Sequence, residues 1–205
     1  MSGEPPAVGR SARERRAHAT HFYSGTDVLR NIPDIRDAAT LEEFERFAVS
    51  TASKFRAPLE AFTYQAFKGL HRELFEDVYR WAGQIRDYST GRGSAPFCLP
   101  EFIDDNMERI FAQLAANAVL KDLTADAFAE HAAELINEIN AVHPFIEGNG
   151  RVSREFLRDL AEHAGHPLDL SRFERDTWYA AAARGFEAAD NAPMRKCIRR
   201  ALIAG

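Results

Sequence analysis

The chain has 205 residues, of which 26 are Lys or Arg and 31 are Asp or Glu, so its net charge is −5 at pH 7. Hydrophobic residues make up 45% of the chain and charged residues 28%, which are ordinary values for a globular domain and exclude a disordered protein. The acidic balance argues against a dedicated nucleic-acid binder, and no apolar run reaches the ~18 residues of a membrane span. We therefore expect one domain with neither nucleic acid nor membrane as its partner.

Residues 1–20 are expected to form a mobile basic arm, because they combine four arginines with prolines and small residues and lack the apolar segment of a secretory signal. An arm that binds phosphate or a partner is the alternative. The two cysteines, Cys98 and Cys197, lie far apart and indicate reduced thiols in a cytoplasmic protein rather than a disulfide framework or a zinc site. Residues 21–205 then form the single domain, with a core at about 65–198.

Apolar residues at helical spacing predict an all-α fold after the arm. The expected helices cover residues 41–57, 59–75, 100–120, 124–139, 148–164, 176–189 and 194–203. The apolar faces are expected to include Leu41, Phe44, Ala48 and Phe55 in the first helix, Phe102, Asn106, Ile110 and Leu114 in the third, Phe128, Ala132, Leu135 and Ile139 in the fourth, and Val152, Phe156, Leu160 and Ala164 in the fifth. Thr124 is expected to cap the fourth helix, and Gly165 to end the fifth.

Residues 88–97 are the one exception to the helical pattern. They hold two glycines, small hydroxyl residues and a proline, which cannot continue a helix. This composition favours a short β-hairpin or an irregular flap, and a bare loop is the alternative.

The chemistry is concentrated in the stretch His143-Pro-Phe-Ile-Glu-Gly-Asn-Gly-Arg-Val-Ser-Arg154, which predicts a loop running into a helix N-terminus. Gly148 and Gly150 allow a ligand to approach the backbone, and the first-turn N–H groups lack intrahelical acceptors. Together with the positive end of the helix, Arg151 and Arg154 make this an anion site that suits a polyphosphate.

Three further side chains in this stretch have a chemical use beside a polyphosphate. Glu147 would repel an anion unless Mg²⁺ lies between them, since Mg²⁺ takes one or two carboxylates together with phosphate oxygens. Asn149 offers an amide that can orient phosphate or metal, and a neutral His143 can accept a proton from an attacking hydroxyl. Taken singly, each residue has a structural interpretation as a cap, a turn or a solvated charge, but their combination within twelve residues favours a functional site.

The stretch resembles the Fic motif, His-Pro-Phe-x-Asp/Glu-Gly-Asn-Gly-Arg-x-x-Arg, and matches it at every specified position. Residues 74–86, Leu-Phe-Glu-Asp-Val-Tyr-Arg-Trp-Ala-Gly-Gln-Ile-Arg, are similar to the helix-to-flap passage of Fic proteins. Residues 26–31, Thr-Asp-Val-Leu-Arg-Asn, resemble the N-terminal segment of stand-alone bacterial members. The resemblance therefore implies a Fic-type helical bundle with a hairpin flap beside the active site.

The resemblance also implies a reaction, the transfer of AMP from ATP to a Ser, Thr or Tyr hydroxyl of a target protein. His143 would be the general base and Glu147 the Mg²⁺ ligand, while Phe145 would be buried and anchor the loop. The nucleotide phosphates would be bound by the backbone from Gly148 to Arg151 and by side chains, through Gly148, Asn149, Gly150, Arg151 and Arg154. Kinase-like members carry Lys where Gly150 stands, so Gly150 indicates AMP transfer.

The same resemblance assigns the flap to the target protein, which would add a strand to it through Gly91, Arg92, Gly93, Ser94, Ala95, Pro96 and Phe97. Trp178 and Tyr179 lie where relatives place adenine contacts, although Glu187 stands near the position of an Asn that some relatives use. The alternative is that both aromatic residues belong to the core.

Many Fic proteins contain an inhibitory pattern, Ser/Thr-x-x-x-Glu-Gly/Asn, and this sequence has no match to it. We therefore expect either an uninhibited enzyme or a separate small antitoxin that supplies a Glu against Arg154. A bacterial toxin acting in the cytoplasm is the preferred hypothesis, and a secreted effector that modifies a host protein is the alternative. A catalytically silent binding module is disfavoured because His143, Glu147 and both arginines are present.

Overall fold

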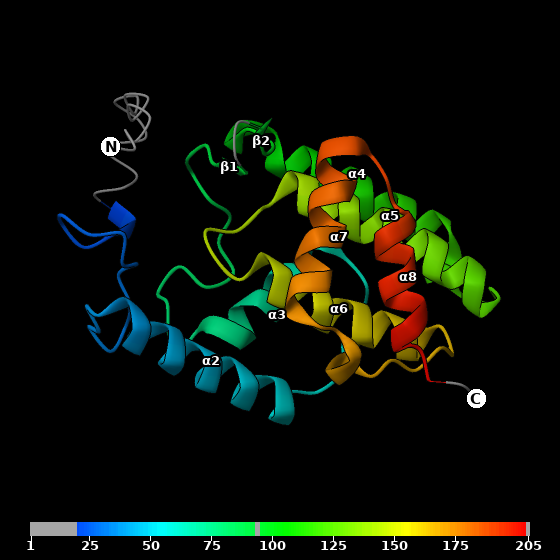
Figure 1. Cartoon of the computed structure of the whole chain (residues 1–205), viewed down its shortest axis with the longest axis horizontal. Helices are drawn as coiled ribbons and strands as arrows, with labels where there is room; N and C mark the ends of the chain where they lie inside the picture. Colours follow the sequence, from blue (N-terminus) through cyan, green and yellow to red (C-terminus); the bar gives the residue numbers. More distant parts are fainter. Residues whose placement is uncertain (1–19, 93–94, 204–205) are drawn as a thin grey trace, which may run out of the picture.

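The structure is a computed structural model that describes residues 20–92 and 95–203. The expected basic arm, apart from its last residue, and the flap residues Gly93 and Ser94 lie outside this range. Helices and strands follow the order α2 (Ala38–Phe55), α3 (Tyr64–Phe75), β1 (Gly91–Arg92), β2 (Ala95–Pro96), η1 (Pro100–Phe102), α4 (Ile103–Ala116), η2 (Ala118–Leu120), α5 (Ala125–Val142), α6 (Asn149–His163), η3 (Leu170–Arg172), α7 (Arg175–Ala188) and α8 (Ala192–Ala201). The prediction of an all-α fold with a small hairpin is confirmed (Figure 1).

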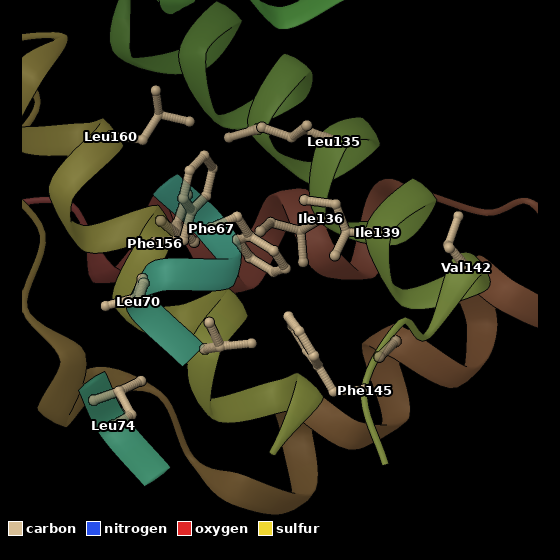
Figure 2. Close-up of a cluster of buried hydrophobic side chains, with 14 of the residues drawn as sticks. Phe67, Leu70, Leu74, Leu135, Ile136, Ile139, Val142, Phe145, Phe156 and Leu160 are labelled. Carbon is tan, nitrogen blue, oxygen red and sulfur yellow. The ribbon is translucent and has the colours of Figure 1, made fainter. Parts of the chain in front are cut away.

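Helix α5 occupies the middle of the bundle, where it packs against α4, α6, α7 and α8, while α3 packs against α6 (Figure 1). The core between α3, α5 and α6 contains the fully buried rings of Phe67, Phe145 and Phe156 (Figure 2). Phe67 and Phe156 meet edge to face at 5.3 Å. Burying a side chain of this size stabilises the fold by about 1.5–3 kcal/mol. Phe145 thereby ties the loop before α6 to the core, as expected.

Two of the expected helices differ from the observed ones at their ends. The second begins at Tyr64 rather than at residue 59, because the Thr63 hydroxyl accepts the Ala66 N–H at 3.1 Å and caps the helix there. The third is divided into η1, α4 and η2, because the chain leaves helical geometry after Ala116. Ala118, Val119 and Leu120, which make up η2, all have positive φ values and therefore do not continue the right-handed helix α4.

The predicted apolar faces are wrong at Phe55 and Phe102, which are 77% and 52% exposed. Leu41, Ile110 and Leu114 are buried as predicted, and the other buried residues are Glu45 and Val49 in α2, and Ile103, Met107 and Phe111 in α4. Apolar residues spaced three or four positions apart are compatible with more than one neighbouring face of a helix. In α2 the partners of Glu45 determine which of these faces is buried. The expected faces of α5 and α6 are confirmed, with Ala164 half-buried at the end of the second.

The hairpin predicted for residues 88–97 is present. Strand β1 pairs with β2 in antiparallel fashion, with Gly91 opposite Pro96 and Arg92 opposite Ala95. A Cβ at Gly91 would lie 2.4 Å from the Ala95 carbonyl oxygen, so the close strand pairing requires glycine there. Across residues 20–92 and 95–203, every helix is too short or too polar to cross a lipid bilayer.

Candidate active site

The motif begins where α5 ends, at a strained residue. His143 is the C-cap of α5 with φ 51°, and its N–H donates to the Ile139 carbonyl at 2.9 Å. A residue other than glycine is uncommon in this left-handed region, and such strain is often found at functional sites. The turn leads the chain away from α5 toward the loop that starts α6.

Buried polar contacts hold the loop between α5 and α6. The His71 ring is fully buried and lies flat against Phe145, with ring centroids 3.8 Å apart. Its Nδ1 accepts the Gly83 N–H at 2.9 Å, so the neutral ring carries its proton on Nε2 and donates it to the Glu147 carbonyl at 3.0 Å. Burial lowers the pKa of His71 to about 4, which keeps the ring neutral.

Asn149 closes the same loop from the other side. Its side-chain oxygen accepts the Phe145 N–H at 3.0 Å, and its side-chain nitrogen donates to the Phe145 carbonyl at 2.9 Å. Both ends of the amide are therefore engaged and the residue is buried, so this side chain shapes the loop instead of facing phosphate or metal as the sequence analysis expected. Its backbone N–H in the first turn of α6 remains its contribution to an anion site.

Gly148 begins α6 in a conformation that only glycine tolerates well. Its φ is +84°, and a Cβ there would lie 2.3 Å from the Phe75 ring. The N-terminus of α6 can therefore lie directly over the α3 side chain. The Gly148 N–H donates to the Glu147 carboxylate at 2.7 Å, so the first amide of the expected anion site is bound by the neighbouring side chain.

A cavity of about 670 Å³ opens over the N-terminus of α6. Its floor includes Glu147, Gly148, Gly150, Arg151 and Arg154. Residues 27–29, the N-terminal half of α2, η3 and the start of α7 also line this cavity. This volume suits a small molecule of nucleotide size.

Arg151 is paired with two carboxylates. One nitrogen of its guanidinium contacts Glu45 of α2, and the other lies 3.1 Å from Glu147. Burial alone would lower the pKa of Arg151, but these carboxylates raise it above its ordinary value. Glu45 also accepts the Tyr79 hydroxyl, and burial raises the pKa of this phenol.

The sequence analysis missed Glu45 and Tyr79. The available signal was a carboxylate at the position four residues after Leu41, on the apolar side of an amphipathic helix. A buried carboxylate requires a partner, and that partner is the first arginine of the motif.

Arg154 differs from Arg151 because it makes no ion pair within residues 20–92 and 95–203. Its guanidinium lies over the Trp178 ring at 5.6 Å, and burial lowers its pKa. Trp178 is buried and packs edge to face on Phe173, whereas Tyr179 is 49% exposed and lines the cavity. Trp178 is thus a core residue, and of the two aromatics only Tyr179 lies where a ligand can contact it.

His143 lies in an apolar environment on the flap side of the site. The Phe97 ring is parallel to the imidazole with centroids 4.0 Å apart. The Phe186 ring packs against Phe97 with centroids 4.8 Å apart. Burial, assisted by the charges of Arg86 and Arg92, lowers the pKa of His143 to about 4. The imidazole is therefore neutral at physiological pH and able to accept a proton.

The flap residues divide into two groups. Gly91, Arg92, Ala95 and Pro96 form the hairpin itself. Phe97 is 7% exposed and turns inward, so its ring contacts His143 and is not available on the surface as a target contact. Gly93 and Ser94 lie outside the described residues.

Comparisons with known proteins identify the family of the chain. The model of the Fic/DOC family matches residues 61–161. The chain is 42% identical over 179 residues to "Probable protein adenylyltransferase y4lH" of Sinorhizobium fredii. The match covers 87% of this chain and 93% of that relative. It is 32% identical to "Probable protein adenylyltransferase Fic" of Escherichia coli, covering 80% of this chain and 83% of that relative.

A solved structure shows the same fold with a nucleotide bound. BepC of Bartonella tribocorum, a VirB-translocated effector protein with bound AMPPNP, matches with a TM-score of 0.82 at 25% identity. The match covers 91% of this chain and 97% of BepC. The chain therefore belongs to the Fic/DOC family and, like its curated relatives, is a protein adenylyltransferase.

Proposed function

We propose that this enzyme transfers AMP from ATP to a Ser, Thr or Tyr hydroxyl of a target protein, with His143 as the general base. The observation that carries the proposal is a half-buried, neutral imidazole at the start of the motif loop, followed by a cavity over a helix N-terminus that contains Arg154, which has no ion pair among the described residues. The first group accepts a proton, and the second binds phosphate.

In the proposed reaction, His143 removes the proton from the target hydroxyl as the oxygen attacks the α-phosphorus of ATP. A bond forms between the target oxygen and phosphorus, the bond from the α-phosphorus to the bridging oxygen breaks, and pyrophosphate leaves. The low pKa of His143 ensures that the acceptor form predominates before the hydroxyl arrives. The proton then resides on the imidazole and is released to solvent.

The phosphates of ATP would bind at the N-terminus of α6. Backbone N–H groups of Asn149 and Gly150 and the positive end of the helix favour negative charge there. Arg154 would bind the terminal phosphates, because its charge has no carboxylate partner in the described structure. Arg151 would contribute through the guanidinium edge that Glu147 now contacts, while Glu45 keeps its orientation.

The donor set of the cavity fits Mg²⁺ bound jointly with phosphate. Glu147 is half-exposed at the cavity floor, and a single carboxylate with phosphate oxygens and water satisfies this ion. Within the described residues no group of three or more His, Cys, Asp or Glu side chains forms a dedicated metal cage, which is consistent with this sharing. When bound, Mg²⁺ would offset the charge that develops on the leaving pyrophosphate.

The flap would bind the target as an added strand, through backbone groups of the hairpin formed by Gly91, Arg92, Ala95 and Pro96. We further propose that the enzyme is a bacterial cytoplasmic toxin whose antitoxin inserts a Glu against Arg154. The Arg154 guanidinium lies beside Trp178 and has no ion pair among the described residues, which supports this, because a carboxylate placed there would both gain a charge-assisted bond and occupy the proposed phosphate site.

One observation favours a second candidate for the biological role. BepC, which has the same fold, is named a VirB-translocated effector protein. The same transfer chemistry would then act on a host protein after secretion.

The test of the reaction uses purified protein, a bacterial lysate, Mg²⁺ and ATP labelled at the α-phosphate. We expect a labelled protein band that depends on His143 and disappears in the His143→Ala variant. The enzyme should not transfer label from γ-labelled ATP to a protein, because the γ-phosphate leaves as part of pyrophosphate. A band from the γ-label, or an α-label band that persists in the variant, would contradict the proposal.

The antitoxin is tested by co-expression with the product of the neighbouring reading frame. We expect a stable complex with little transfer activity, and recovered activity when the inserted Glu is changed to Gly. If no complex forms and transfer activity is unchanged, the antitoxin proposal is wrong, and the enzyme is either uninhibited or secreted.

A further inference from the structure

Arg86 is a buried cation that pairs with no acidic side chain in the part of the chain that the structure describes. Its relative exposure is 1%, and it forms no ion pair with any residue of the described chain. Charged side chains are almost never fully buried unless they are paired, because removing a charge from water is costly. The charge is therefore held by another kind of partner.

The partners of Arg86 are four backbone carbonyl oxygens. Nε donates to His143 at 2.7 Å, Nη1 to Tyr88 at 2.8 Å, and Nη2 to both Val142 and Cys98. The Arg86 backbone N–H adds a fifth bond, to the Pro144 carbonyl at 2.9 Å. Carbonyl dipoles stabilise the guanidinium without neutralising its charge.

These acceptors come from two segments with different tasks. Val142, His143 and Pro144 belong to the turn that presents the imidazole, while Tyr88 and Cys98 flank the flap on its two sides. Backbone bonds from Phe97 to Thr90 and from Cys98 to Ala141 run through the same region. One planar group thus joins both ends of the flap to the turn at His143.

The strain at His143 shows why such a joint is useful. Its left-handed backbone persists only where the surroundings hold it, and Arg86 bonds its carbonyl directly. The ring is held from the other side by Phe97, the last residue of the flap segment. Both the backbone and the ring of His143 are therefore located by residues of, or next to, the flap.

We propose that Arg86 is a positioning residue that fixes the flap, and hence the target hydroxyl bound along it, relative to His143. This inference rests on the proposed roles of the flap and of His143. Arg86 lies outside the lining of the cavity in which we propose that ATP binds, and its side chain bonds only to backbone carbonyls among the described residues. Its loss should therefore affect transfer to the target and leave ATP binding intact.

The test compares Arg86→Lys with Arg56→Lys in the full chain. Arg56 is a matched control, because its side chain is also fully buried but pairs with Glu155 and Asp159 away from the cavity. Lysine keeps the charge in both variants and loses the planar fork that binds several acceptors at once. Both variants are expected to lose stability, which thermal unfolding measures.

We expect Arg86→Lys to lower kcat for transfer to the target by about tenfold to a hundredfold, because a misplacement of about 1 Å has that effect on catalysis. The Kd for ATP should stay within about twofold, and the Phe97 and Cys98 amides should exchange with deuterium faster. Arg56→Lys should retain kcat. Equal kcat values and equal flap exchange in the two variants would overturn the proposal.

A measurement on the unmodified protein covers the case in which Arg86→Lys does not fold. If Arg86 links the flap to the turn at His143, the amides of Phe97, Cys98 and His143 should open together and show similar protection from exchange. Flap amides that exchange more than about a hundredfold faster than the His143 amide would overturn the proposal. Because exchange needs no transfer activity, failure of the proposed reaction and failure of this inference are distinguishable.

Discussion

The two halves of the active site use charge in opposite ways. The phosphate half, at the N-terminus of α6, is an open cavity in which Arg154 has no carboxylate partner among the described residues. The proposed base half, around His143 and Phe97, holds a half-buried imidazole that burial and the charges of Arg86 and Arg92 keep neutral. The first half offers an anion a cation that has no carboxylate partner, whereas in the second half burial and neighbouring cations disfavour the protonated ring.

The largest effect that should separate the two halves of the site is expected at His143. Replacing it by Ala should reduce AMP transfer by about 10²–10⁴-fold, because the general base is lost, while ATP affinity stays close to that of the unmodified protein. Label transfer and calorimetric ATP titration measure the two quantities. A parallel loss of ATP affinity would show that the two halves are not separable.

Arg154 gives the converse result. Arg154→Met should weaken ATP binding by about tenfold or more, because a charge-assisted bond to phosphate is lost, and ADP should be affected less if the bond is to the terminal phosphate. Arg158→Met is the matched control, since Arg158 lies one turn further along α6 and pairs with Glu155 and Asp159. Equal effects in the two variants would contradict the assignment of Arg154.

The low pKa of His143 in the base half should also affect how the stability of the protein depends on pH. The pKa of His143 is about 4 in the folded protein and near 6.5 when unfolded, so the unfolded chain binds more protons between these values. Stability should therefore rise with pH from about 4 to 6.5, and this one group should reduce it by on the order of 1–2 kcal/mol at pH 5.

Urea unfolding at pH 5 and pH 7.5 measures this effect, and His143→Ala isolates it. The variant should lose less stability on acidification than the unmodified protein does. An identical pH dependence in both proteins would mean that the folded state does not depress this pKa.

The smallest effect is expected at Glu45, which belongs to the phosphate half. Glu45→Gln keeps hydrogen-bonding atoms beside Arg151 and Tyr79 but removes one negative charge, so ATP should bind about two- to fivefold more tightly. Glu43→Gln, an exposed change on the same helix, should have no effect. Weaker ATP binding by Glu45→Gln would mean that the orientation of Arg151 matters more than the net charge.

Local patterns predicted some elements better than others. The caps at Thr124 and Gly165, the interrupted segment at 88–97 and the apolar faces of α5 and α6 depend on neighbours in the chain, and the structure contains them. The start of α3 was wrong, and the faces predicted for α2 and α4 were wrong at Phe55 and Phe102 although they were right at Leu41, Ile110 and Leu114, because several phases of an amphipathic pattern were acceptable until the packing partners were known.

The sequence by itself determined the loop that we propose to bind phosphate, because all its chemistry lies within twelve consecutive residues and a loop entering a helix is a local structure. Only the tertiary structure decided which side chains complete it. Glu45 reaches Arg151 from α2, Asn149 turns onto Phe145 instead of toward a ligand, and Trp178 is buried while Tyr179 is not. Arg86 and Phe97 come to His143 in the same way, through contacts whose partners are set by packing and not by spacing along the chain.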